Sequence, residues 1–446
     1  MKKKYVRWTL WTIASPFILF IILCILIYLP PIQNFLVDKA AVYASEATGM
    51  NISVGRISLS FPLNLVVTDV DAASPHNDTL LSVRRLQVNV QLLPLLKKQV
   101  EVDGISLQGA TVNSNDLIHG MKLNGTLGEL FISSHGVALD PETAIVNKVL
   151  LKDTDLSLCL NDTAAADTAA SDTTYWKIIL QDIDLQNVSF ALDMPLDSLS
   201  LAASLDNAIL RDGLIDLHKS AYSLQTFRIE NGRVRYDNGK PLAADSLSSG
   251  LDPSHIALTD IGVKLDSLYY GGRNMKAIIS QFVLKERSGV EIVSATGRMV
   301  SNDKVLRVPS LKLETRDSYL ELNAAMDWNA LDFKDEGLVS ARLMADIGKP
   351  DVVRFMGSMD EKFIRQYPSE PLRIRTGIDG DLNKLKLTTL TAELPGALGL
   401  FARGELTHLT DSLLRGGDIT LEAETKDLKF VSTLAEGIEI PYGTRL

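Results

Sequence analysis

The chain has 446 residues, of which 46% are hydrophobic, 22% charged and 6% aromatic, and its formal net charge is −10. This length allows two or three ordinary domains or one elongated array. The hydrophobic content is that of a folded protein, and an acidic chain lacks the basic surface that nucleic-acid binding requires. Two cysteines cannot form a disulfide framework, and we interpret Cys24 and Cys159 as small buried hydrophobic side chains without a redox function.

The amino terminus contains an uncharged apolar run, residues 9–29, which as a helix would span about 30 Å, the thickness of a bilayer core. The alternative of a cleaved signal peptide is less favoured, because the run is longer than a signal-peptide core and no small-residue cleavage site follows it. Cations precede the run, so the positive-inside rule predicts a cytoplasmic N-terminus and an extracytoplasmic body. These cations are Lys2, Lys3, Lys4 and Arg7, and the residues assigned to the membrane anchor are Trp8, Trp11, Phe17, Phe20, Leu23, Leu26 and Tyr28.

The spacing of apolar residues after the anchor predicts one helix followed by β structure. Residues 1–31 form the cytoplasmic stub and anchor, and residues 32–49 have the spacing of an amphipathic helix that stops at Gly49. From residue 50 onward apolar side chains recur at every second position, which predicts antiparallel strands with one apolar and one polar face. We expect residues 50–446 to form one repetitive, elongated and curled sheet with a few short helices, and residues 161–174 to be a flexible insertion.

A short motif recurs along this body. It consists of two apolar residues separated by one position, a polar residue, then Gly, Asn or Asp, and another apolar residue three positions later. Because Gly, Asn and Asp tolerate positive φ, each copy predicts a kinked strand that keeps its apolar side chains on one side. The copies start at Leu65, Ile105, Val149, Ile183 and Phe227, and their kink positions are Asp69, Gly109, Asp153, Asn187 and Asn231.

A second repeat lies nearer the C-terminus. Asp351 and Asp427 each follow a predicted strand and precede apolar residues at helical spacing. This pattern predicts that each aspartate caps a short amphipathic helix. The apolar face of the first helix would consist of Val352, Phe355, Met356, Met359 and Phe363.

No catalytic or metal-binding motif stands out. The six histidines are scattered, with no pair at metal-ligand spacing, and we interpret them as surface polar residues. Residues 379–383 begin like a calcium loop, but Lys384 occupies the position of the required glycine, so a tight turn is predicted. The acidic pairs 153/155 and 182/184 are interpreted as the solvated face of strands. We therefore expect neither enzymatic activity nor a cofactor.

The apolar face itself has two interpretations. The repeats could stack into a filled core, as in a solenoid, or the sheet could curl into a trough whose apolar wall holds acyl chains. The candidate lining residues of such a groove are Phe61, Leu63, Leu65, Val88, Val90, Ile105, Leu107, Val149, Leu151, Ile183, Leu185, Phe190, Phe227, Ile229 and Val234.

The order of several stretches resembles the N-terminal region of the AsmA-like superfamily, and of its TamB branch in particular. These stretches are ISVGRIS (52–58), LNLVVTDVD (63–71), LLSVRRLQV (80–88), LLPLLK (92–97) and VEVDGISLQGA (100–110). The similarity is specific over residues 1–115 and looser beyond them, through the repeated motif and the segment 427–430.

This resemblance implies a single-pass inner-membrane protein with a periplasmic β-taco, a groove that carries phospholipid towards the outer membrane. It also implies a link to outer-membrane protein assembly through an outer-membrane barrel partner. Because TamB proteins are usually far longer, we expect the chain to correspond to an N-terminal portion, truncated at its C-terminus.

Three hypotheses of function follow. The first is a membrane-anchored lipid conduit. The second is an envelope scaffold or assembly factor that binds proteins by strand addition at a sheet edge. The third, a glycan-acting enzyme on a β-helical frame, would need a set of catalytic carboxylates, and none stands out.

Overall fold

The computed structural model describes a mostly β protein, in which 73% of the described residues are in strands and 8% in helices, as predicted. No helix within these residues is long and apolar enough to cross a membrane. The predicted anchor and its preceding cations lie outside them, as do Phe61, most of the insertion and the last residues of the chain. The described residues are 39, 41–43, 45, 46, 48–60, 63–74, 78–91, 102–114, 120–138, 142–161, 175–239, 250–334, 337–356, 361–427 and 430.

The predicted helix before residue 50 is described in part. Its described residues between 39 and 48 are helical. The chain leaves the helix at Gly49, which has a φ of +70° and donates its amide hydrogen to the carbonyl of Ser45 at 2.9 Å. A glycine with positive φ is the usual end of a helix, so the predicted stop is confirmed.

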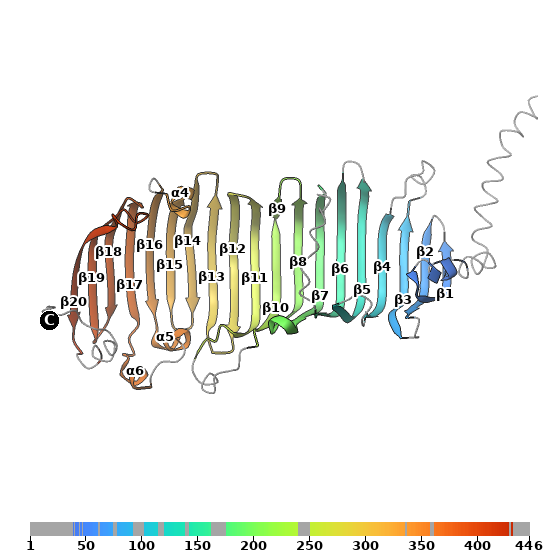
Figure 1. Ribbon diagram of the computed structural model, residues 1–446, viewed down its shortest axis with the longest axis horizontal. Helices are drawn as coiled ribbons and strands as arrows, with labels where there is room; N and C mark the ends of the chain where they lie inside the picture. Colours follow the sequence, from blue (N-terminus) through green and yellow to red (C-terminus); the bar gives the residue numbers. More distant parts are fainter. Residues whose placement is uncertain are drawn as a thin grey trace, which may run out of the picture. The chain divides into compact units, whose positions relative to one another are not determined.

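The chain divides into two compact units. Figure 1 colours the elements of both along the sequence, from blue to red. Unit 1 comprises the described residues of Met1–Asp172 and Ile178–Leu196, and unit 2 those of Thr173–Lys177 and Asp197–Leu446. Unit 1 contains β1 (Asn51–Ser60), β2 (Asn64–Ala73), β3 (Thr79–Val90), β4 (Val102–Asn113), β5 (Met121–Ala138), β6 (Thr143–Leu160) and β7 (Lys177–Met194).

Unit 2 contains the remaining strands and the three labelled helices. Its strands are β8 (Leu199–Asp216), β9 (Ala221–Leu224), β10 (Thr226–Asp237), β11 (His255–Gly271), β12 (Asn274–Glu286), β13 (Glu291–Ser301), β14 (Val305–Thr315), β15 (Tyr319–Asp327), β16 (Leu338–Ile347), β17 (Leu372–Asp381), β18 (Lys384–Leu394), β19 (Leu398–Thr407) and β20 (Gly416–Thr425). Its helices are α4 (Trp328–Leu331), α5 (Lys349–Met356) and α6 (Glu361–Gln366).

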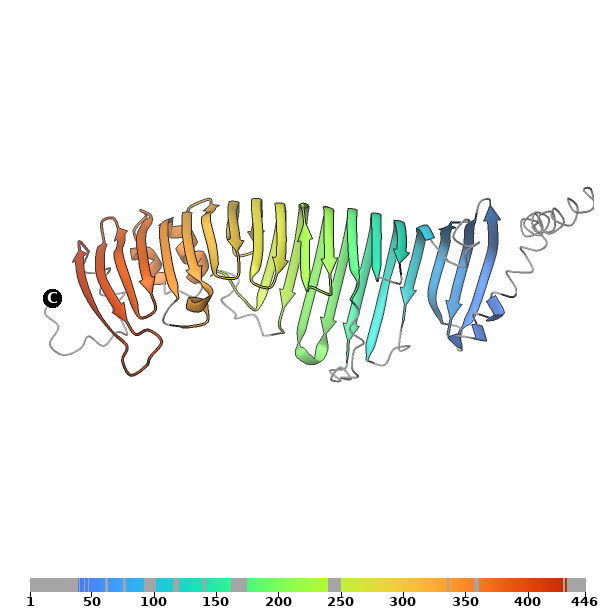
Figure 2. The same ribbon diagram turned by 90° about the horizontal axis from the view of Figure 1, so that it is seen from above.

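Antiparallel pairing of successive strands, as predicted, builds both units. In unit 1 each strand from β1 to β5 pairs antiparallel with the next. In unit 2, β9 and β10 lie end to end between β8 and β11, and from β11 to β20 each strand pairs with its successor. Figure 2 shows the strands of unit 2 side by side in chain order.

The contact between β6 and β7 is an exception. Three side-chain hydrogen bonds join these strands, and each connects residues 34 positions apart. A constant offset is the signature of parallel strands, whereas antiparallel partners have a constant sum of residue numbers. Parallel neighbours need a connection of a dozen or more residues, and the predicted insertion lies in the segment between β6 and β7. The bonded pairs are Asn147–Gln181, Asn187–Asp153 and Ser189–Asp155.

The predicted kinks are confirmed at all five positions. The φ angles are 54° at Asp69, 61° at Gly109, 49° at Asp153, 51° at Asn187 and 53° at Asn231. All five motif strands thus contain a residue in the left-handed region, where Asn, Asp and Gly are the best tolerated residues.

The kinks of unit 1 form one row across the sheet. From β1 to β6, the register continues unchanged on both sides of this row, while the ladder is interrupted at the row itself. Every strand therefore shifts its side-chain alternation at the same level. The row consists of Gly55, Asp69, Arg84, Gly109, Gly128 and Asp153. At Gly128 the packing is so close that a Cβ atom would lie 2.8 Å from the Cβ of Asp153.

The structure confirms the predicted helix cap at Asp427 and contradicts the one at Asp351. Asp427 accepts a hydrogen bond from the amide of Phe430 at 3.1 Å, which confirms the predicted cap. Asp351, by contrast, lies inside the first turn of α5 and does not precede it, because the helix begins at Lys349. The single predicted helix is also wrong, since α5 ends at Met356 and Phe363 belongs to α6.

Candidate functional site

The candidate site is the apolar face of the sheet, which the register of unit 1 assembles from neighbouring strands. Directly opposed residues in antiparallel strands project to the same face with Cβ atoms about 5 Å apart. Two rows therefore run across β1 to β6, and six of the predicted lining residues lie in them. The first row is Leu59, Leu65, Val88, Ile105, Ile132 and Val149, and the second is Ile57, Val67, Leu86, Leu107, Leu130 and Leu151.

The kinks extend this face past the point where it would otherwise end. A shift of one residue normally moves all following side chains to the opposite face of a strand. Beyond the kink row, however, the apolar positions shift by one as well, so that the next row remains apolar up to a buried threonine. This row is Val54, Val70, Val83, Ala110, Leu127 and Thr154.

The other predicted lining residues of unit 1 lie beside these rows. The constant offset of 34 between β6 and β7 places Ile183 beside Val149 and Leu185 beside Leu151. Phe190 is 39% exposed, more than the other described candidates. Leu63 and Val90 are adjacent at one end of the face, where the Leu63 carbonyl accepts the Val90 amide at 3.0 Å.

Unit 2 carries an equivalent face of its own. Phe227 and Ile229 each head a row that crosses ten further strands, and Val234 lies opposite Ala203 and Leu258. The row of Phe227 continues through Leu265, Ile279, Gly297, Leu311, Leu322, Leu343, Thr376, Leu390, Ala402 and Leu421. The row of Ile229 continues through Val263, Phe282, Ala295, Leu313, Leu320, Ala345, Ile374, Ala392, Leu400 and Ala423.

The predicted lining residues of the apolar face are not fully buried. Within the described part of the chain, the extensive contacts of each strand are with its ladder neighbours, and α4 adds a few contacts with β15 and β16. The predicted lining residues are accordingly half-buried, with Phe190 more exposed. A closed sandwich or a filled solenoid would bury such residues fully. Among the described residues, the predicted lining side chains are instead only half-buried.

Two helical segments cover the ends of the face in unit 2. At one end, Ala330 of α4 packs with Val339 and Leu385. At the other end, Phe363 of α6 packs with Tyr367 and Phe430, with ring centroids 5.6–5.8 Å apart. Burial raises the pKa of the Tyr367 hydroxyl. Between these two coverings the Leu, Ile, Val and Phe residues of the rows from β10 to β19 are half-buried, whereas Ala295, Ala345 and Ala402 are buried.

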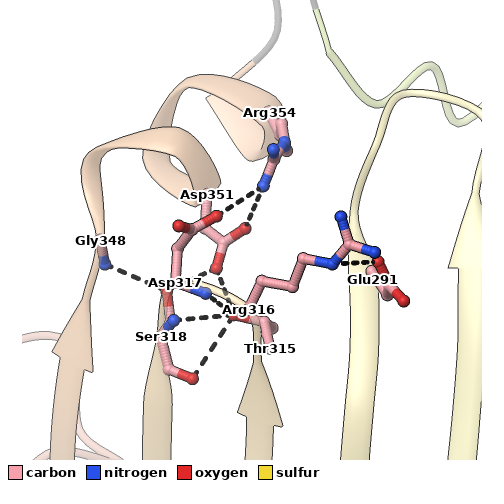
Figure 3. A network of polar contacts seen from close by, with 8 residues as sticks. All are labelled: Glu291, Thr315, Arg316, Asp317, Ser318, Gly348, Asp351 and Arg354. Atoms are coloured by element: carbon pink, nitrogen blue, oxygen red, sulfur yellow. Dashed lines mark hydrogen bonds and ion pairs between the residues drawn. The ribbon is translucent and has the colours of Figure 1, made fainter.

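A polar network holds α5 beside the sheet (Figure 3). The Asp351 carboxylate is 1% exposed and accepts hydrogen bonds from the hydroxyls of Thr315 and Ser318, the latter at 2.6 Å. Arg354 donates to it at 3.1 Å and to Asp317 at 2.9 Å. A buried carboxylate is tolerated only when it is paired in this way, so the network clamps α5 to the β14–β15 turn. Sequence reasoning assigned Asp351 to a cap and missed this role.

Two other predictions about polar residues are wrong. Cys159 is half-buried and lies opposite Lys122 on the polar face, because its neighbours Leu158 and Leu160 occupy the apolar face. His255 is only 7% exposed, because it sits between the carboxylates of Asp252 at 2.8 Å and Asp237 at 3.6 Å. The hydrogen bond from His255 is the main reason that the pKa of Asp252 lies below its ordinary value.

The predicted turn at residues 379–383 is confirmed. The Asp381 carboxylate accepts the amides of Asn383 at 2.9 Å and Lys384 at 2.7 Å, which closes the β17–β18 turn. Of the acidic pairs predicted to be solvated, Asp153 and Asp155 are exposed, whereas Asp182 and Asp184 are half-buried. Within the described ranges, no group of three or more His, Cys, Asp or Glu side chains could hold a metal ion.

Exposed apolar side chains gather at one end of the strands of unit 2. Phe333 and Leu338, in and after the β15–β16 connection, are 79% and 58% exposed, and Leu413 and Leu414 in the β19–β20 connection are 93% and 62% exposed. Both connections lie at the same end, because the strands between them alternate in direction. Phe333 also has a φ of +55°, a strained conformation for a bulky residue.

No protein-family model matches the chain, and a search of curated proteins finds no significant match. The resemblance to the AsmA-like superfamily therefore stays a prediction.

Proposed function

We propose that this chain is a membrane-anchored envelope protein whose apolar face binds the acyl chains of phospholipid and conducts lipid across the periplasm towards the outer membrane. The observation that supports it is the alignment of half-buried Leu, Ile and Val side chains into continuous rows. When a protein exposes a contiguous apolar patch to water, that patch normally serves to bind an apolar partner.

The size of the face suits an acyl chain. Six strands at a spacing of about 4.8 Å make each row of unit 1 about 24 Å long, whereas half of a bilayer core is about 15 Å thick. Each buried methylene contributes about 0.8 kcal/mol, so a chain of ten methylenes in contact with the rows would gain up to about 8 kcal/mol before its ordering cost. Conduction along the face requires only that no single position binds much more strongly than its neighbours.

The direct test is photo-crosslinking in the full-length chain. A photoreactive phenylalanine analogue replaces Leu107, in the middle of the second row, and in a separate variant replaces Gln108, which projects to the polar face. Mass spectrometry of the irradiated protein is expected to find phospholipid adducts at position 107 and none at position 108.

A matched pair of charge substitutions then tests transport. Leu107→Asp places a carboxylate among the apolar rows, and Gln108→Asp adds the same charge on the exposed opposite face. The first is expected to weaken the outer-membrane permeability barrier and the second to leave it intact. Equal adducts at both positions, or full activity of Leu107→Asp, would argue against the groove.

The membrane anchor and its orientation need a separate measurement. A reporter that is active only in the periplasm, fused after Thr48, is expected to be active, because the cations before the apolar run favour a cytoplasmic N-terminus. An inactive reporter would remove the periplasmic location and the proposed route of lipid with it.

Strand addition is the second candidate function, and β20 favours it. All ten residues of β20 are exposed, including Leu421 at 61%, and among the described strands only β19 pairs with it. An unpaired edge offers backbone donors and acceptors to an incoming strand. A photoreactive residue at Thr420 would form protein adducts in the scaffold function, and no protein adduct in a chain that acts on lipid alone.

A further inference from the structure

The polar face of unit 2 contains a pair of opposed cations. The antiparallel register places Arg228 of β10 directly opposite Lys264 of β11. Like charges in directly opposed positions destabilise a sheet. In the registers of the described strands, this is the one place where two cations face each other in this way.

Neither cation has a carboxylate partner within the described part of the chain. Neighbouring cations are paired: Arg233 lies 3.5 Å from Asp206, and Lys285 lies 2.8 Å from Asp260. The nearby Glu230 carboxylate accepts a long hydrogen bond from Asn207 at 3.5 Å. The pair thus has no ion-pair partner among the described residues.

A hollow lies beside this pair. Its volume is about 300 Å³, and it coincides with the irregular register between Ile229 and Gly232, where the ladder of β10 and β11 is interrupted. Two cations and one carboxylate among its lining residues give the site a net charge of +1. The lining residues are Arg228, Ile229, Glu230, Gly262, Val263, Lys264 and Gln281.

We propose that this hollow binds a phosphate group, held by Arg228 and Lys264. A guanidinium presents paired N–H donors that match a phosphate, and a lysine ammonium adds a compact charge. Gln281, opposite Lys264 on β12, supplies a further amide donor. The bound anion would relieve the repulsion of the two cations. The two cations and Gln281 lie on the polar face, and Ile229 and Val263 of the apolar row also line the hollow; the proposal rests on the cations and not on the proposed lipid groove.

The test is titration of the purified full-length chain at constant ionic strength. Two probes separate the sources of the phosphate: inorganic phosphate represents a free anion, and glycerophosphoethanolamine represents the headgroup of a phospholipid. Binding of either probe supports the site, and the tighter one identifies its source.

Three glutamine substitutions give the test its specificity. Arg228→Gln and Lys264→Gln are each expected to weaken binding about tenfold or more, since each removes a charge-assisted contact. Arg235→Gln is the matched control, because Arg235 is an exposed cation of the same strand that lies opposite Ala257 and outside the hollow. It is expected to change the affinity less than about twofold.

Folding of the variants is checked by their melting temperatures. Without ligand, Arg228→Gln is expected to melt no lower than the unchanged protein, because it removes a repulsion, and phosphate is expected to stabilise only the unchanged protein and Arg235→Gln. The proposal is overturned if neither probe binds at millimolar concentration, or if Arg235→Gln weakens binding as much as Arg228→Gln does.

Discussion

Replacement of Asn187 by valine tests whether the kinks depend on backbone conformation. Asn187 has a φ of +51°, is exposed, and donates its side-chain amide to Asp153 of the neighbouring strand at 2.9 Å. Valine removes the hydrogen bond and also places a β-branched side chain in the left-handed region, where it clashes with the backbone. Glycine removes the same hydrogen bond without this clash.

The two costs can be separated in size. The hydrogen bond contributes about 0.5–1.5 kcal/mol, and the left-handed conformation costs about 1–2 kcal/mol for a β-branched residue, whereas Asn and Gly tolerate it. Asn187→Val should therefore destabilise the β6–β7 contact by about 2–3 kcal/mol, and Asn187→Gly by about 1 kcal/mol or less. A local loss of 2 kcal/mol corresponds to amide exchange that is about 30-fold faster.

Hydrogen exchange measured by mass spectrometry is the suitable assay, because it reports on each strand separately. Faster exchange is expected in peptides of β6 and β7 and not in β1, since the strands contact mainly their neighbours. Gln186→Val is the control: Gln186 is exposed and precedes the kink, and valine suits a strand. If glycine and valine accelerate exchange equally, or if Gln186→Val does so too, the backbone explanation is refuted.

Three further outcomes are expected. Gly128→Ala should cost about 1–3 kcal/mol in urea unfolding, because its new Cβ atom would overlap the neighbouring kink residue, whereas Gly399→Ala, with no atom within 4 Å, should cost nothing. Asp252 has a lowered pKa when folded, so its contribution to stability is complete above its unfolded pKa and is lost as the pH falls through the folded value. Asp252→Asn should therefore make the stability of the protein depend less on pH in this acidic range. Phe430→Ala should cost about 3–5 kcal/mol and expose α6 to hydrogen exchange, because its ring is 1% exposed, while Phe355→Ala, at 54% exposure, should leave exchange unchanged.

The kinks and the apolar rows could be predicted from sequence because their causes are local. Asp69 and Asn231 reveal their kinks through residue type and through the shift in apolar spacing around them. Leu65 and Ile105 lie on the apolar face because every second residue of a strand projects to the same side. Such patterns need no knowledge of which strands are neighbours.

Features that arise between strands could not be read in this way. The opposition of Arg228 and Lys264 depends on the register of β10 with β11. The burial of Asp351 depends on two hydroxyls more than thirty positions earlier in the chain. His255 lies between Asp237 and Asp252, which reach it from the preceding strand and turn.

The sequence by itself determined the β class, the apolar face and the kinks, since alternation and backbone preference act within a few residues. The tertiary structure decided the division into two units, the parallel contact of β6 with β7, and the position of the helices at the ends of the face. These features depend on which segments meet and in which register, and that choice is set by the summed packing of residues far apart in the chain.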